Sequence, residues 1–229
     1  LPAQTADSMN TNTGSDPGSW RETYLFLKQQ PAILTIYLFT LIDFVVVALF
    51  NLLLAPVIKY QFDNQDIWLT ILDVTFTLGA IAGGVFVARL GDKLTYSVPF
   101  SLVTACFASL VFIGYAWAFP VVVLLSVILL LGISTTLSSV TWSTALQKAS
   151  SVAIKGRLAS LRFIVNSLFV TLATLFVSYL EMYSYQYATT GAAVVIIGFV
   201  LFAFTQHYLC QRNISGFKFS SLYSRSTWN

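Results

Sequence analysis

The sequence predicts an all-α integral membrane protein with six transmembrane helices, and two features of its composition support this fold class. Charged residues make up 9% of the 229 positions and hydrophobic residues 57%, whereas soluble domains are about 25% charged. Residues 94–147 and 182–211 contain no Asp, Glu, Lys or Arg. Since about 20 apolar residues span the hydrocarbon core of a bilayer as a helix, we expect membrane-spanning helices rather than a water-soluble domain.

Composition also limits the partners. The formal net charge of +3 is too small to indicate nucleic acid. The two cysteines, Cys106 and Cys210, lie within or at the ends of apolar segments, which supports neither a disulfide framework nor a zinc site. We therefore expect no metal and no cofactor, and the lipid bilayer as a partner. The chain begins with Leu1 and lacks a basic segment followed by a short apolar run, so we expect no signal peptide and a processed or partial chain.

The first thirty residues precede the membrane segments. Residues 1–19 are mostly small and polar, a composition that cannot bury enough apolar surface to fold, so we predict a flexible cytoplasmic linker. Residues 20–30 place Trp20, Tyr24 and Leu27 at helical spacing, which is typical of an amphipathic segment at the membrane interface.

Six apolar segments follow, and together they form a predicted membrane bundle over residues 31–209. The predicted spans are residues 31–57, 67–90, 95–118, 120–145, 158–180 and 187–209. The third and fourth spans are separated by a turn at Pro120. Residues 210–229 are predicted to be a cytoplasmic tail.

Basic residues set the orientation, because Lys and Arg concentrate in cytoplasmic loops. Eleven basic residues fall on one side of the six-span topology, and only Lys59 falls on the other. Both termini are therefore predicted to be cytoplasmic, in a multi-pass protein of the cell membrane, with the bacterial inner membrane as the expected location. The opposite ends of the spans carry a predicted interfacial belt of aromatic residues: Tyr60, Trp68, Tyr115, Trp117, Tyr183, Tyr185 and Tyr187.

The six spans divide into two triplets, residues 31–118 and 119–209. The first triplet starts inside and the second starts outside, which is the arrangement of an inverted-topology repeat. The two triplets share no clear sequence identity, so the topology alone suggests this repeat.

Two carboxyl groups lie within the predicted spans, where an ionisable group is costly and indicates function. Asp43 is about 18 Å along the first span and therefore near the midplane. Asp73 is about 9 Å from the outer end of the second span, where function and simple interfacial hydration are both open. Gly79 and Gly83 form a small-xxx-small seam for close helix packing.

Other polar residues in the spans have two readings. Arg162 either contacts a substrate or extends to the inner headgroups, and we favour the headgroups. Asn51 and Asn166 are candidate hydrogen-bond donors to a substrate. The cytoplasmic half of the fourth span is rich in hydroxyl groups, which either line a cavity or bond to their own backbone one turn back.

Three segments resemble the major facilitator superfamily of transporters. Residues 79–84 (GAIAGG) and 88–93 (ARLGDK) resemble the loop motif that recurs between helices eight and nine of that family. Residues 24–32 resemble the start of helix seven in its drug and siderophore exporter branch. Residues 155–162 (KGRLASLR) are similar to the start of helix eleven in the same branch.

The resemblance covers residues 20–209 and implies the carboxy-terminal half of a twelve-helix transporter, helices seven to twelve. Its expected partners are then an amino-terminal six-helix half and a small-molecule substrate. In the family, the loop motif belongs to a latch that holds the inner gate closed. The residues that the resemblance assigns to this latch are Gly84, Arg89, Gly91, Asp92, Lys93 and Arg157. Ala88 and Asp92 depart from the usual residue types of the motif.

The leading hypothesis is secondary active transport, namely proton-coupled efflux of a small amphipathic molecule such as a drug or siderophore, without enzymatic activity. Desolvation favours the neutral form of a carboxyl group, so a carboxyl group in a membrane cavity can exchange a proton for a substrate. Asp43 is the first candidate for this role and Asp73 the second.

Two alternatives remain open. The chain could be a transport-inactive fragment, or a half-transporter that works only with a partner. More remotely, Ser134 in the sequence Gly132-Ile133-Ser134 and His207 resemble part of a rhomboid-like intramembrane serine protease. Thr135 stands where that motif requires a second glycine.

Overall fold

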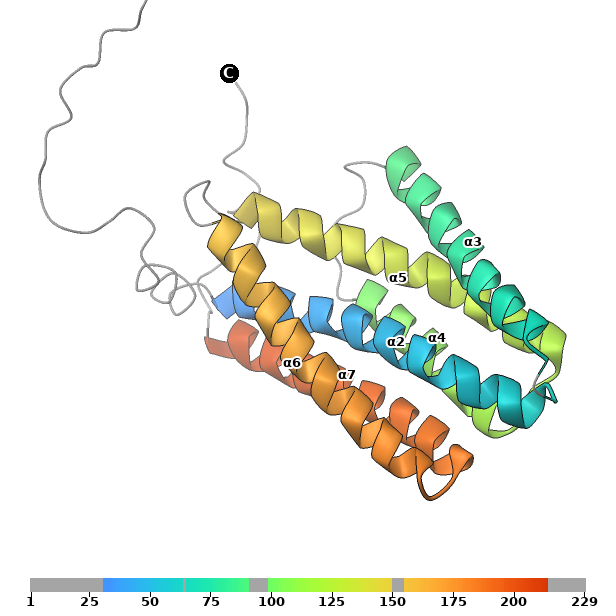
Figure 1. The fold of residues 1–229 in the computed structure, drawn as a ribbon. Coiled ribbons are helices and arrows are strands. Elements are labelled where there is room, and N and C mark those ends of the chain that lie inside the picture. The colour runs from blue at the N-terminus through green and yellow to red at the C-terminus, as the bar shows by residue number, and fades with distance from the viewer. Residues whose placement is uncertain (1–30, 64, 91–98, 150–154, 214–229) are drawn as a thin grey trace, which may run out of the picture.

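The computed structural model describes residues 31–63, 65–90, 99–149 and 155–213, and these residues form six helices and no strand (Figure 1). The helices are α2 (Pro31–Gln61), α3 (Ile67–Leu90), α4 (Pro99–Ala116), α5 (Val121–Ala149), α6 (Lys155–Glu181) and α7 (Tyr185–Asn213). The predicted linker, the predicted amphipathic segment and residues 214–229 lie outside the described residues.

The helix lengths match membrane crossings. Five helices, all except α4, are long and apolar enough to span a bilayer, which indicates a multi-pass membrane protein. The described part of α4 has 18 residues, or about 27 Å at 1.5 Å per residue, against a hydrocarbon core of about 30 Å. Residues 95–98 of the predicted third span lie outside the described residues.

The helix boundaries differ from the predicted spans mainly by extension. The boundaries of α3 coincide with the prediction, whereas α2 continues to Gln61 and α7 to Asn213. Apolar residues mark only the part of a helix that lies in hydrocarbon. Polar residues beyond it can keep the helical conformation, so the apolar run underestimates the helix length.

Helix α2 is the central helix of the bundle. In its apolar window 67% of residues are buried, compared with 17% in α3 and 17% in α6. Figure 1 shows α2 between the α3–α5 pair and the α6–α7 pair. Helix α2 packs against all five other helices. A polar side chain on the buried side of α2 is therefore enclosed by several helices at once.

The packing partly follows an exchange of the two triplets α2–α4 and α5–α7. Exchanging the triplets turns the contact α3/α5 into α6/α2 and the contact α4/α5 into α7/α2, and all four contacts are present. Contacts α2/α5 and α4/α7 map onto themselves and are also extensive. Three contacts have no equally extensive counterpart among the described residues: α6/α7 (counterpart α3/α4), α2/α4 (counterpart α5/α7) and α2/α3 (counterpart α5/α6).

The glycine seam on α3 packs closely against a neighbouring helix, as predicted, and that helix is α5. A Cβ atom at Gly79 would overlap the backbone carbonyl oxygen of Leu129, and one at Gly83 would lie 2.7 Å from the carbonyl oxygen of Ile133. Gly132 of α5 faces the seam, with its ideal Cβ position 3.1 Å from the Cα of Gly79. Small residues on both helices let their backbones approach closely.

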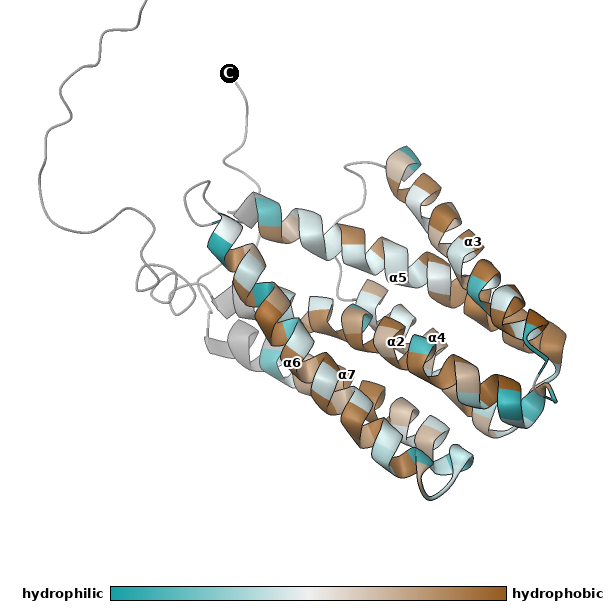
Figure 2. Ribbon diagram, viewed as in Figure 1, coloured by the Kyte–Doolittle hydropathy of each residue, from teal (hydrophilic) through white to brown (hydrophobic). Residues whose placement is uncertain are grey.

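The two ends of the bundle differ. The connections α2–α3 (62–66), α4–α5 (117–120) and α6–α7 (182–184) lie at one end, which we call the short-turn end. The connections α3–α4 (91–98) and α5–α6 (150–154) lie at the other, which we call the long-loop end and which is predicted to be cytoplasmic. Figure 2 shows hydrophilic residues concentrated near the helix ends and pale colouring along the half of α5 towards the long-loop end. Asp63 and Ala118 in the short turns have positive φ angles of 49°.

One member of the predicted aromatic belt is misplaced. Tyr115 is fully buried, so it cannot contact headgroups, whereas Trp117, Tyr183 and Tyr187 are exposed. The backbone carbonyl of Tyr115 accepts hydrogen bonds from the side chains of Gln61 and Tyr185. These bonds place the last turn of α4 inside the bundle rather than at its surface.

Candidate functional site

Asp43 lies in the middle of α2 and is buried, with 3% of its surface exposed. Neither carboxyl oxygen has a hydrogen-bond partner among the described residues. The hydroxyl group of Ser138 on α5 and the guanidinium group of Arg162 on α6 act on the carboxyl group through space. We predicted that Asp43 faces either a partner helix or a cavity. The structure shows the first alternative, since Asp43 faces α5 and α6.

A chain of hydrogen bonds between α4 and α5 ends at Ser138, the hydroxyl group that acts on this carboxyl group. Trp142 Nε1 donates to Ser101 Oγ at 2.6 Å, and Ser101 Oγ lies 3.0 Å from Ser138 Oγ. Since Ser101 accepts from Trp142, its own hydrogen is available to Ser138. The hydrogen of Ser138 is then free to point towards Asp43. The ring of Phe39 stacks on Trp142, with 5.1 Å between centroids, and fixes the indole.

Arg162 is half-buried and contacts α5 and α2, while its expected extension to the inner headgroups stays a prediction. Its Nη1 donates to Ser143 Oγ on α5 at 3.2 Å, and its Cζ lies 5.4 Å from the centroid of the Phe44 ring on α2. A guanidinium group over an aromatic face gains about 0.5–2 kcal/mol. The Phe44 ring and the Ser143 hydroxyl group together stabilise the guanidinium charge inside the bundle.

The two candidate asparagines occupy different environments. Asn166, one turn beyond Arg162 on α6, is 3% exposed, and its side-chain nitrogen and oxygen have no hydrogen-bond partner among the described residues. Asn51, two turns beyond Asp43 on α2, is exposed. Buried amide groups without partners are costly, so Asn166 is suited to a ligand or water between helices. The amide group of Asn51 is accessible from outside the bundle.

Asp73 is not part of the Asp43 site. It lies on α3 and is exposed, as are Thr70 and Thr77 of the same polar stripe. The stripe therefore faces away from the α3–α5 contact. This placement agrees with interfacial hydration of Asp73 and leaves its role as a proton carrier a prediction.

Most hydroxyl groups of α5 bond to their own helix. The side chains that do so are Ser126, Ser134, Thr135, Thr141 and Thr144. Ser138 and Ser143 instead reach other helices. Sequence reasoning treated the whole cluster alike and missed these two residues, as well as Ser101 and Trp142. Helical spacing of Ser138 and Trp142 on one face of α5 was a usable signal, whereas nothing in the sequence linked them to Ser101.

The latch residues are only partly described. Gly91, Asp92 and Lys93 lie outside the described residues. Arg89 is exposed at the end of α3, and Arg157 is half-buried in the first turn of α6, so both lie at the long-loop end. Space around Gly84 is open, since an added Cβ would meet nothing within 4 Å. Its role in a gate stays a prediction.

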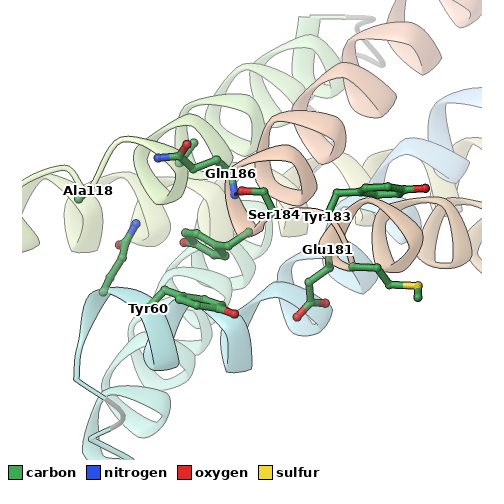
Figure 3. A pocket seen from close by; sticks show the side chains of 10 residues that line it. Tyr60, Ala118, Glu181, Tyr183, Ser184 and Gln186 are labelled. Carbon is green, nitrogen blue, oxygen red and sulfur yellow. Dashed lines mark hydrogen bonds between the residues drawn. The ribbon is translucent and has the colours of Figure 1, made fainter.

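A separate pocket of about 510 Å³ opens at the short-turn end. Figure 3 shows Tyr60 and Glu181 on facing sides of this pocket, while Tyr183 points away from it. The pocket also borders Gln61, which is 18 residues beyond Asp43, or about 27 Å along α2. The structure therefore does not combine the pocket and the buried carboxyl group into one site.

The residues of the protease alternative do not form a described catalytic pair. Ser134 is buried, and its hydroxyl group donates to the carbonyl oxygen of Leu131 at 3.0 Å. The side chain of His207 lies outside the described residues. Among the described residues, no three His, Cys, Asp or Glu side chains come together in a way that could hold a metal ion.

Comparisons with known proteins add no further assignment: no family model, no curated protein and no solved structure matches the chain.

Proposed function

We propose that this chain is the carboxy-terminal six-helix half of a proton-coupled secondary transporter of the major facilitator type, which exports a small amphipathic molecule. The observation that carries the proposal is the carboxyl group of Asp43, enclosed in mid-helix by a membrane bundle and without a hydrogen bond among the described residues. Burying a charged carboxylate in this way costs several kcal/mol. Protonation removes that cost.

Proton exchange at Asp43 can couple to movement because the carboxyl group lies between helices. Helix α2 carries it, and α5 and α6 contribute the two side chains that act on it. Neutral and charged Asp43 therefore favour different positions of α5 and α6 relative to α2. A substrate that prefers one of those positions exchanges for the proton.

The helix pairing supports a half-bundle of this type. An inverted repeat of three helices predicts that each contact has a counterpart under exchange of the triplets. The contacts α3/α5 and α4/α5 have such counterparts in α2/α6 and α2/α7. The peripheral positions of α3 and α6 leave one side of α2 accessible, where Asn51 is exposed, and this side suits contact with a substrate or with the other half.

Transport by the whole protein that contains this chain tests the proposal. In membrane vesicles with an imposed proton gradient, Asp43→Asn should abolish gradient-driven movement of a fluorescent amphipathic probe, and Asp43→Glu should retain part of it. The matched control is Asp66→Asn, which removes an exposed carboxyl group from the α2–α3 turn and should retain transport. Unchanged gradient-driven transport in correctly inserted Asp43→Asn protein would contradict the proposal.

A further inference from the structure

Arg162 connects two helices that do not otherwise pack along one another. Helices α5 and α6 each contact α2 extensively but share no comparable contact of their own. The guanidinium group of Arg162 crosses the Phe44 ring of α2 at 5.4 Å and donates to Ser143 Oγ of α5 at 3.2 Å. This single side chain therefore ties α6 to α5 across α2.

The same guanidinium group has a second possible partner. Asp43 directly precedes Phe44 in the sequence, its carboxyl oxygens lack hydrogen bonds within the described residues, and the charge of Arg162 acts on it. Tyr37 is the other ionisable group near Arg162. Its hydroxyl group already donates to the carbonyl oxygen of Leu158 at 2.5 Å, so Asp43 is the partner still available.

Arg162 is the charged residue shown to act on this carboxyl group; the other charged residues of α6 are Lys155 and Arg157 in its first turn and Glu181 at its far end. Helices α4 and α5 face it with hydroxyl groups, Ser101 and Ser138. On α3, the charged side chains Asp73 and Arg89 are exposed. Helix α7 has no charged residue among its described side chains; its tyrosines in that part are Tyr185 and Tyr187, near the short turn, and the exposed Tyr208. On α2 itself, Tyr37 lies nearest in sequence, and Lys59 and Tyr60 lie at the short-turn end.

We propose that Arg162 is a positioning residue that exchanges Ser143 for Asp43 when Asp43 loses its proton, and thereby releases α5 from α6. This inference rests on the proposed function, because it gives the proton a mechanical effect. In this step one proton passes from the carboxyl group of Asp43 to water, and the guanidinium group stays protonated throughout. No covalent bond changes.

The direction of the exchange follows from charge. Both hydrogen bonds have a charged donor, but a carboxylate also carries the opposite charge and can accept two guanidinium N–H groups at once, whereas the Ser143 hydroxyl group is a neutral acceptor. Neutral Asp43 offers little competition, so Arg162 stays on Ser143 and the tie is closed. Charged Asp43 attracts Arg162 and opens the tie. Low pH therefore favours the closed tie, and high pH favours the open one.

Distance measurements between α5 and α6 test the exchange. Spin labels at Gln147 and Ser160, both exposed on their helices, report the separation in the full chain in lipid nanodiscs, after Cys106 and Cys210 are replaced by serine. We expect one short, narrow distance distribution at acidic pH. At alkaline pH we expect a shift to a longer, broader distribution.

Three variants assign the shift to the named residues. Asp43→Asn should keep the short distance at every pH, and Ser143→Ala should give the long distance at every pH. The matched control is Thr144→Ala, since the Thr144 hydroxyl donates to Val140 O in its own helix, and its distances should follow those of the unsubstituted protein. A distance that does not respond to pH, or that responds equally in Asp43→Asn, would overturn the inference.

Transport by the same variants separates this inference from the proposed function. If Asp43→Asn abolishes proton-driven transport but the distances never depend on pH, the exchange by Arg162 is wrong and the proposed function stands. If Asp43→Asn removes the pH response of the distances and transport is unchanged, the partner exchange is supported and the proposed function is contradicted.

Discussion

At the scale of single residues, the surroundings of Asp43 are polar on one side only. Ser138 supplies a hydroxyl group from α5, and Ser101 and Trp142 hold that hydroxyl group in place. Arg162 supplies a positive charge at a greater distance, engaged with Ser143. The carboxyl group is thus buried beside these groups without a hydrogen bond from a described residue. That arrangement favours a group that gains and loses a proton over one that is permanently paired.

Replacing Ser101 tests the hydrogen-bond chain. Ser101→Ala removes the acceptor of Trp142 Nε1 and leaves a buried donor unsatisfied, which costs about 1–3 kcal/mol. We expect a matching loss of stability in thermal unfolding of the detergent-solubilised protein. The control is Ser126→Ala, because that exposed hydroxyl group donates only to Val122 O of its own helix, and it should unfold like the unsubstituted protein. Equal stability of the two variants would contradict the chain.

The sequence predicted some residues of the site and not others. The difference is whether a residue stands out by itself or only through contacts with distant parts of the chain. Asp43 was predictable, since an acidic residue in an apolar span is exceptional by itself. The role of Ser143 was not, because eight hydroxyl groups of similar chemistry crowd the same half of the helix. Only the positions of α5 and α6 against α2 decide which of them meets Arg162. The sequence specifies those positions through packing of the whole bundle, which no local pattern reveals.

At the scale of elements, the closest helix contact is the α3–α5 pair. Backbone atoms of Phe76 and Ala80 on α3 lie where a Cβ of Gly132 would stand. Two helices at this separation gain van der Waals contact along their length, which is the main attraction between helices in a bilayer. We therefore expect the α3–α5 pair to move as one unit. Helix α2, which carries the buried carboxyl group, packs against this pair.

Gly132→Ala tests the rigidity of this pair. The added methyl group meets backbone on the facing helix and cannot be relieved by rotating a side chain, so we expect a loss of about 1–3 kcal/mol. Gly198→Ala is the control, since its surroundings are open and alanine favours the helix by up to about 1 kcal/mol. Thermal unfolding in detergent measures both. A Gly132→Ala protein as stable as the Gly198→Ala protein would disprove the close contact.

The elements themselves were well predicted. The boundaries of α3 match the expected span, and the turn at Pro120 separates α4 from α5 as expected. Apolar length is a direct physical requirement of the bilayer, so it identifies spans without knowledge of their neighbours. The burial of Tyr115 was not predicted, because its depth depends on contacts of its carbonyl group with Gln61 and Tyr185.

At the scale of the whole molecule, the helices alternate between two ends with different charge. Arg89, Lys155 and Arg157 lie at the long-loop end, and Lys59, Asp63 and Asp66 at the short-turn end. Basic residues are retained on the cytoplasmic side during insertion. The positive-inside rule therefore predicts that the short-turn end, with its pocket, faces outwards.

Cysteine accessibility checks this orientation. In protein lacking Cys106 and Cys210, a cysteine introduced at Ser184 in the α6–α7 turn should react with a membrane-impermeant maleimide on intact cells. A cysteine at Lys155 should react only after the membrane is opened. The opposite pattern would invert the bundle and place the latch residues outside the cell.

The most direct test of the account is the protonation of Asp43 itself. Infrared difference spectroscopy of the whole protein in lipid, with and without an exported probe, resolves the carbonyl stretch of a protonated carboxyl group. We predict such a band at neutral pH, its change when the probe binds, and its loss in Asp43→Asn but not in Asp73→Asn. A band that persists unchanged in Asp43→Asn, or no band in the unsubstituted protein, would contradict proton carriage by this residue.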